Sequence, residues 1–171
     1  MRPVVVTAAV TFLLDQVTKI VVVHGLRLDE RLAIDVAPPW LQFRMAWNQG
    51  VNFGLLSNSA EIARWGLVVL ALAISAWVWI WIRRGGQGRL ARIGAGLLIG
   101  GAVGNVLDRV LYGAVADFLN MGFPGFSNPY SFNVADIAIF AGAIALVLFT
   151  GDAKTGKGAA RPARGGRAKG P

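Results

Sequence analysis

The chain has 171 residues, of which 55% are hydrophobic and only 15% charged, and its formal net charge is +8. A soluble domain usually has about a quarter of its residues charged, so this composition indicates lipid as the solvent. The basic residues mostly flank apolar runs, where they set membrane orientation, and this distribution argues against nucleic-acid binding.

Four apolar runs are long enough to predict transmembrane helices, because a span needs about 20 mostly apolar residues. They cover residues 4–23, 62–82, 90–107 and 134–150. The first run could instead be a cleaved signal peptide, since Arg2 precedes it, but no good small-residue cleavage site follows it. We therefore predict an all-α membrane protein whose four spans form one domain over residues 1–150.

The second and third runs carry further membrane signals. Trp77, Trp79 and Trp81 close the second run just before two arginines, which is typical of a membrane–water interface. Glycines recur every four residues in the third run, as small-xxx-small spacing that lets helices approach closely. These glycines are Gly96, Gly100 and Gly104.

The distribution of basic residues predicts the orientation. Eleven of the seventeen Lys and Arg residues lie toward one side: before the first span, from the end of the second span to the start of the third, or after the fourth. The excess places both termini in the cytoplasm, so that residues 24–61 and 108–132 face outward. Residues 151–171 consist largely of Gly, Ala, Lys and Arg, and we predict a disordered basic tail that attracts anionic lipid headgroups.

The outer segments carry patterns of their own. Apolar residues alternate with others from Leu41 to Trp47, which indicates a half-buried strand, and Gly50 and Asn52 suit a turn. We expect a small β-sheet on the outer membrane surface. The turn-rich, aromatic stretch 121–130 is typical of a mobile flap.

Ionisable residues within spans are costly and usually functional. Asp15 and Lys19 are four residues apart and share a helix face, where they form either a structural ion pair, which we favour, or a direct substrate contact. Asn105, Asp108 and Arg109 lie at the outer end of the third span. They can form a capping and salt-bridge cluster there.

Asp117 and Asp136 give a sharper signal. The topology brings both to the outer membrane surface, one after the third span and one in the first turn of the fourth, just behind Asn133. Two close carboxylates cannot both ionise easily, so one can activate water while the other, protonated, polarises a carbonyl. Peptidase chemistry is one reading of this pair, and an ion or proton site of a transporter is another.

Five motifs on this framework resemble those of lipoprotein signal peptidases, the signal peptidase II family. They are Asp15–Lys19 (DQVTK), Trp47–Gly54 (WNQGVNFG), Gly100–Arg109 (GGAVGNVLDR), Gly113–Phe118 (GAVADF) and Phe132–Asp136 (FNVAD). Each motif alone is weak, but together they occur in the family's order across residues 15–136. Asn52 and Ala116 depart mildly from the residues common in the family.

The resemblance implies an aspartic endopeptidase of the bacterial inner membrane, with its active site toward the periplasm. Such enzymes remove signal peptides from prolipoproteins, cutting before the diacylglyceryl-modified cysteine, and globomycin inhibits them. The expected partners are thus lipidated prolipoproteins, membrane lipids and globomycin.

The resemblance also implies residue roles. Asp117 and Asp136 match the catalytic pair. Asn48, Gly50, Asn105, Arg109 and Asn133 match site-lining positions, and Asp15, Lys19 and Asp108 match supporting positions.

Two rival classes fit the residues less well. A transporter commonly shows internal repeats and broken helices at mid-membrane, and neither pattern is visible here. Presenilin-like and prepilin-like peptidases have an aspartate just after a glycine within a span, whereas the sole Gly-Asp pair here is Gly151-Asp152, in the tail. The chain has no cysteine and a single histidine, His24, so we expect neither a metal nor another cofactor.

Overall fold

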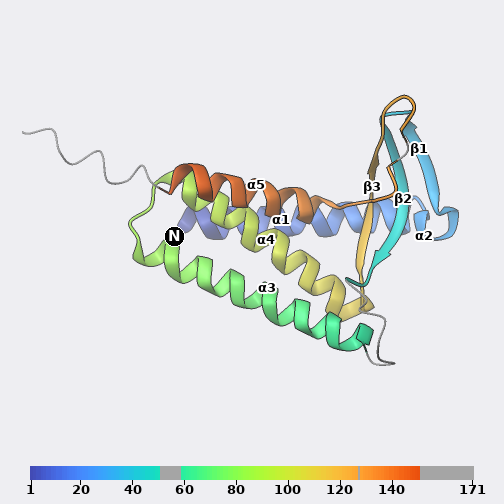
Figure 1. Cartoon of the computed structure of the whole chain (residues 1–171). Coiled ribbons are helices and arrows are strands. Elements are labelled where there is room, and N and C mark those ends of the chain that lie inside the picture. The colour runs from blue at the N-terminus through green and yellow to red at the C-terminus, as the bar shows by residue number, and fades with distance from the viewer. Residues whose placement is uncertain (51–58, 127, 151–171) are drawn as a thin grey trace, which may run out of the picture.

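The computed structural model describes residues 1–50, 59–126 and 128–150. Asn52, with the end of the Trp47–Gly54 motif, and the predicted tail 151–171 lie outside the described residues. Within them the chain forms a helical bundle with a three-stranded sheet across one end (Figure 1).

The helices occupy nearly the ranges that the apolar runs predict. Helix α1 covers Arg2–Lys19 and continues as the π-helix η1 over Ile20–Gly25, and the short α2 (Leu28–Arg31) follows. The later helices are α3 (Ser59–Arg84), α4 (Arg89–Tyr112) and α5 (Val134–Phe149). Helix α4 runs five residues past the predicted end at 107, so that Asp108 and Arg109 belong to its last turns.

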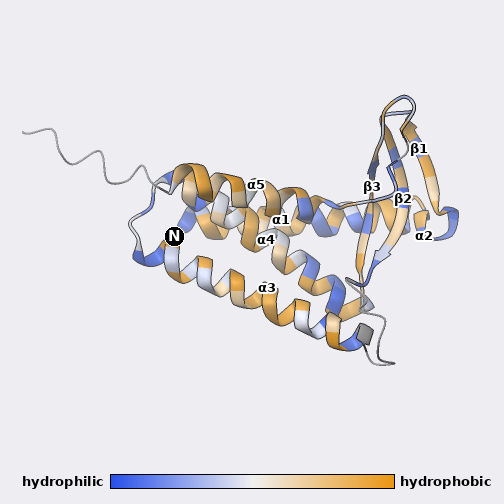
Figure 2. Cartoon of the chain, in the orientation of Figure 1, coloured by the Kyte–Doolittle hydropathy of each residue, from blue (hydrophilic) through white to orange (hydrophobic). Residues whose placement is uncertain are grey.

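Three helical segments are long and apolar enough to cross a membrane, judged by length and composition: Arg2–Gly25, Glu61–Arg84 and Arg89–Tyr112. Helix α5 is apolar but shorter, with 16 residues. Figure 2 shows hydrophobic residues along most of these helices. Many of their large apolar side chains are exposed, among them Leu13, Val69 and Phe140, as expected for surfaces that face lipid.

Helix α4 forms the centre of the bundle and packs against α1, α3 and α5. Its glycines make this possible. A Cβ atom on Gly96 or Gly100 would lie within 3 Å of the backbone of α1, and one on Gly101 would lie 2.5 Å from the carbonyl oxygen of Ala135 in α5. The close approach predicted from the small-xxx-small spacing is confirmed.

Substitution of Gly100 should separate α1 from α4. A Cβ there would lie 2.5 Å from the carbonyl oxygen of Ala8, so Gly100→Ala is expected to destabilise the fold by about 1–3 kcal/mol through overpacking. Gly66→Ala is the matched control, because a Cβ on Gly66 would have no neighbouring atom within 4 Å. Thermal unfolding in detergent measures both variants, and equal Tm values would contradict this packing.

The sheet is antiparallel, with strand order β1-β2-β3. Strand β1 covers Ala33–Ala37, β2 covers Leu41–Asn48 and β3 covers Val115–Met121. The strand predicted from the alternation at 41–47 is thus β2. The sheet is tied to the bundle by an apolar cluster in which Val23 and Leu28 pack with Phe118. Strand β3 follows α4 directly and leads toward α5, so it connects the helix that carries Asn105, Asp108 and Arg109 to the helix that carries Asp136.

Candidate active site

Local structure places the two candidate aspartates. Helix α4 ends at Tyr112 and is capped by Gly113, whose φ of +81° is the left-handed conformation that commonly terminates a helix. The chain then enters β3, which carries Asp117. Asp136 lies in the first turn of α5, where it forms a capping box with the N-cap residue Asn133.

Asn133 contacts both aspartates. Its side-chain Nδ2 donates a hydrogen bond to Asp117 Oδ1 at 2.6 Å. Its backbone N–H donates to Asp136 Oδ2 at 3.2 Å, and its Oδ1 accepts from the backbone N–H of Asp136 at 2.9 Å. Asn133 is fully buried. One side chain therefore holds β3 and the start of α5 together, and with them the two carboxyl groups.

The side-chain amides of Asn48 and Asn105 donate to the remaining oxygens of the two carboxyl groups. Asn48 Nδ2, at the end of β2, donates to Asp117 Oδ2 at 3.0 Å. The backbone N–H of Gly50 donates to Asn48 Oδ1 at 2.9 Å, and this bond fixes which end of the Asn48 amide faces Asp117. Asn105 Nδ2, on α4, donates to Asp136 Oδ1 at 2.9 Å. Each of the four carboxyl oxygens thus accepts a hydrogen bond from an N–H group.

The two carboxyl groups differ in environment. Asp117 is 3% exposed, whereas Asp136 is half-buried. Burial, together with the negative charge of Asp136, raises the pKa of Asp117 from 3.8 to about 6, against the lowering effect of its hydrogen bonds from Asn48 and Asn133. A carboxyl group with that pKa can hold or release a proton near neutral pH, which general acid–base chemistry requires.

The chain matches a family model described as signal peptidase (SPase) II over residues 7–150. The chain belongs to the signal peptidase II family. This membership confirms the enzyme class that the five motifs predicted, an aspartic endopeptidase that cleaves signal peptides from prolipoproteins.

Relatives and solved structures agree with the family match. The chain is 42% identical to the lipoprotein signal peptidase of Methylobacterium sp. (strain 4-46), over 88% of this chain and 91% of the relative. It is 37% identical to that of Nitrobacter hamburgensis, over 86% and 90%. Two solved structures described as a bacterial membrane enzyme superpose with TM-scores of 0.70 and 0.73, at 26% and 25% identity. They cover 86% of this chain and 87% and 92% of theirs.

Three buried charged side chains, Asp15, Lys19 and Asp108, lie next to these asparagines. Lys19 Nζ lies 2.7 Å from Asp15 Oδ2 and 2.7 Å from Asp108 Oδ2. Lys19 also donates to Asn105 Oδ1 at 3.3 Å. The structure thus pairs Asp15 with Lys19, as the sequence suggested, and adds Asp108 as a second partner from α4.

Arg109 faces a different environment. Its Nη1 donates to the carbonyl oxygen of Asn105 at 3.3 Å, and its buried Nε has no partner among the described residues. Both residues line a cavity of about 480 Å³ between α3, α4 and α5. The other lining residues are apolar: Leu67, Leu70, Ala71, Ile74, Leu98, Ala102 and Ile139. The cavity is therefore an apolar trough with one polar end next to Asp136.

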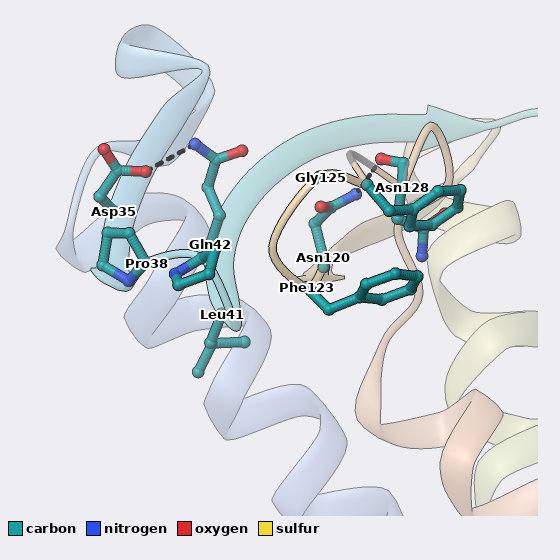
Figure 3. A pocket seen from close by; sticks show the side chains of 11 residues that line it. Asp35, Pro38, Leu41, Gln42, Asn120, Phe123, Gly125 and Asn128 are labelled. Atoms are coloured by element: carbon teal, nitrogen blue, oxygen red, sulfur yellow. Dashed lines mark hydrogen bonds between the residues drawn. The ribbon is translucent and has the colours of Figure 1, made fainter.

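A second cavity, of about 440 Å³, lies at the far end of the sheet (Figure 3). Gln42 donates to Asp35 on one side of it, and Asn120 donates to the backbone of Asn128 on the other. Phe123 stacks on Phe126 beside them. None of the predicted site residues lines this cavity, so it is separate from the aspartate pair.

Sequence reasoning missed Gln16. Its Nε2 donates to Asp15 Oδ2 at 3.1 Å, to Asp108 Oδ1 at 3.2 Å and to the carbonyl oxygen of Gly104 at 3.4 Å. The available signal was its place within the Asp15–Lys19 motif, as a polar residue inside an apolar run. Across the described residues, no group of three or more His, Asp or Glu side chains is arranged to hold a metal ion.

Proposed function

We propose that Asp117 and Asp136 are the catalytic dyad of this signal peptidase II family member and that they activate a water molecule directly. The observation that carries this proposal is the shared contact through Asn133, which bonds to both carboxyl groups. The raised pKa of Asp117 supports it, because a dyad needs one proton held near neutral pH.

The two aspartates take different roles in the proposed step. Asp136 lies in the first turn of α5, where the helix dipole favours a negative charge, so it is the base that removes a proton from water. Asp117 carries the shared proton and donates a hydrogen bond to the carbonyl oxygen of the scissile peptide. The hydroxide adds to the carbonyl carbon. The C–N bond then breaks as the amine takes from Asp136 the proton that came from water, and the products are a carboxylic acid, which ionises, and a free amino group.

The substrate we propose is a prolipoprotein that carries a diacylglyceryl group on its cysteine, cut just before that cysteine. The dyad comes from β3 and the start of α5, which meet where the sheet joins the bundle (Figure 1), and we expect a lipid-anchored peptide bond to arrive at this level. The apolar trough beside Asp136 suits an apolar signal segment. Arg109, whose buried Nε has no partner among the described residues, lies at the polar end of the trough and is placed to bind a substrate carbonyl. Globomycin is expected to compete for the same site.

We also propose that all four helices span the inner membrane, with both termini in the cytoplasm and the dyad facing the periplasm. Helix α5 is about 24 Å long at 1.5 Å per residue, shorter than the roughly 30 Å apolar layer. Its polar start at Asn133 and Asp136 would therefore lie slightly within the outer boundary of that layer. Residues 1–150 form the peptidase domain in this proposal, and the basic tail 151–171 stays in the cytoplasm.

A reporter fused to the C-terminus tests this orientation. The excess of basic residues on the proposed cytoplasmic side predicts that alkaline phosphatase, which is active only outside the cytoplasm, gives little activity there. The same reporter fused after Asn48, in a segment predicted to face outward, is the positive control. Strong phosphatase activity from the C-terminal fusion would reverse the topology.

The substrate is tested by incubating the purified enzyme with a lipidated prolipoprotein, with and without globomycin. We expect release of the signal peptide, a new N-terminus at the lipidated cysteine, and loss of both in globomycin. The unlipidated precursor is the matched control. Equal cleavage of the two precursors would show that the enzyme does not require the diacylglyceryl group.

A further inference from the structure

The buried charges behind the dyad form a chain across two helices. Asp15 and Lys19 come from α1 and Asp108 comes from α4, and they are 0%, 5% and 1% exposed. The Lys19 ammonium group lies between the two carboxylates, 2.7 Å from an oxygen of each. One cation therefore joins two anions that different helices supply.

Each of these carboxylates also accepts a backbone hydrogen bond next to the dyad. Asp15 Oδ1 accepts from the N–H of Ala135 at 2.9 Å, and Ala135 directly precedes Asp136. Asp108 Oδ2 accepts from the N–H of Ala116 at 3.2 Å, and Ala116 directly precedes Asp117. The two catalytic residues are thus attached, through equivalent contacts, to the two ends of the Asp15–Lys19–Asp108 chain.

We propose that Asp15, Lys19 and Asp108 act as a clamp that sets the spacing between the two catalytic aspartates by holding the backbone amides of Ala135 and Ala116. This inference rests on the proposed dyad. The three residues are positioning residues, since they act through the backbone of β3 and α5. In a reaction that needs both carboxyl groups at one water, a displacement of about 1 Å can lower the rate about 10²-fold.

The clamp extends to the side chains that contact the dyad. Lys19 donates to Asn105 Oδ1 at 3.3 Å, so the Asn105 amide must present its Nδ2 to Asp136. The absence of a side chain at Gly104 leaves room for Asp15, because a Cβ there would lie 2.6 Å from Asp15 Oδ2. Asp15 is therefore held by close packing against α4 as well as by its hydrogen bonds.

Fold stability alone is a weak explanation for these charges. Buried ion pairs lose hydration, and well-packed apolar residues of similar volume are often as stabilising. An apolar set, however, could not hold the N–H groups of Ala116 and Ala135, which require acceptors. Asp15 and Asp108 hold the backbone amides of Ala135 and Ala116, and Lys19 joins the two carboxylates. A lysine shared between two carboxylates therefore fixes the two amides relative to each other.

Lys19→Met tests the clamp by removing the cation while keeping most of the side-chain volume. We expect kcat on a lipidated prolipoprotein to fall about 10²-fold, with KM within about threefold, because the reacting groups move while the substrate trough stays intact. Thr18→Val is the matched control, since Thr18 Oγ1 donates to the carbonyl oxygens of Leu14 and Asp15 in its own helix. Its kcat should stay close to that of the wild type.

The pH profile gives a readout that a merely structural role would not move. The charged groups around Asp117 are Asp136 on α5, Lys19 on α1, and Asp108 and Arg109 on α4. The Lys19 charge lowers the pKa of Asp117, so Lys19→Met should shift the alkaline limb of kcat/KM to higher pH. An unchanged limb would contradict the electrostatic part of the clamp.

The double variant Lys19→Met with Asp108→Asn separates positioning from stability. It removes one positive and one negative charge, and the amide oxygen of the introduced asparagine can still accept from the N–H of Ala116. We expect it to regain most of the Tm lost in Lys19→Met, while kcat stays at least about tenfold below that of the wild type. Recovery of kcat along with Tm would overturn the clamp. Full activity in Lys19→Met, alongside inactive Asp117→Asn and Asp136→Asn variants, would also overturn it and leave the dyad intact.

Discussion

Asp117→Asn and Asp136→Asn should each lower kcat for prolipoprotein cleavage by at least about 10³-fold, since general acid–base catalysis alone contributes about 10²–10⁴-fold and each change removes one member of the pair. The asparagine side chain has nearly the same shape but can neither hold the shared proton nor accept one from water. The measurement is single-turnover cleavage by purified variants in detergent or lipid. Asp35→Asn is the control, because Asp35 is an exposed acid on β1 that bonds to Gln42.

Loss of activity in Asp117→Asn should come with little loss of stability. The pKa of Asp117 is raised from 3.8 to about 6 in the fold, so ionising this carboxyl group destabilises the native state above about pH 6. That penalty is absent below the pKa that Asp117 has in the unfolded chain, because there both the folded and the unfolded protein hold the proton. The introduced amide has one acceptor oxygen where Asn48 and Asn133 need two, so it also loses a buried hydrogen bond. The two effects oppose each other, and the variant is expected to unfold at a Tm close to that of the wild type at pH 8. A collapsed Tm at pH 8 would mean that the lost activity reflects misfolding.

The second large effect is on the pH dependence of the enzyme. The proposed mechanism needs Asp117 protonated, so kcat/KM, which reports the free enzyme, should fall as pH rises through about 6. Bound substrate excludes water from the space around the dyad, which raises the pKa of Asp117 further, so the alkaline limb of kcat should lie at higher pH. A kcat/KM that increases steadily from about pH 5 to about pH 9 would contradict the assigned roles.

Asp136→Asn offers a direct check on the coupling within the pair. The negative charge of Asp136 raises the pKa of Asp117, so its removal should lower that pKa. Infrared difference spectra of the Asp117 carboxyl group can follow the titration in the inactive variant, with Asp117→Asn as the blank. A pKa that stays at about 6 would show that burial alone sets it.

The sequence predicted the helices well because lipid imposes a simple rule: a span must be apolar and about 20 residues long. The end of α4 was missed by five residues, since Asn105, Asp108 and Arg109 interrupt the apolar run although the helix continues to Tyr112. Strand β2 was predictable from its alternation. Strand β3 was not, because it is nearly all buried and its residues do not alternate in exposure.

The site was predictable in its members but not in its connections. Ionisable and amide residues inside apolar runs stand out, and the motif order assigned them roles that remain predictions. The contacts of Asn133 to both aspartates, and of Asp15 and Asp108 to backbone amides, depend on tertiary packing. Gln16 was missed because one amide beside Asp15 gives no sign of the three oxygens that it contacts.

The central claim is that the dyad delivers water straight to the peptide carbonyl, and a single turnover in H₂¹⁸O tests it most directly. Excess enzyme cleaves a lipidated prolipoprotein, and mass spectrometry then reads both the released signal peptide and the enzyme. Direct attack by water predicts one ¹⁸O atom in the new C-terminal carboxylate of the signal peptide and none in Asp117 or Asp136. Label that enters an aspartate first, with an unlabelled signal peptide, would show that a carboxylate attacks the substrate covalently and would contradict the proposed mechanism.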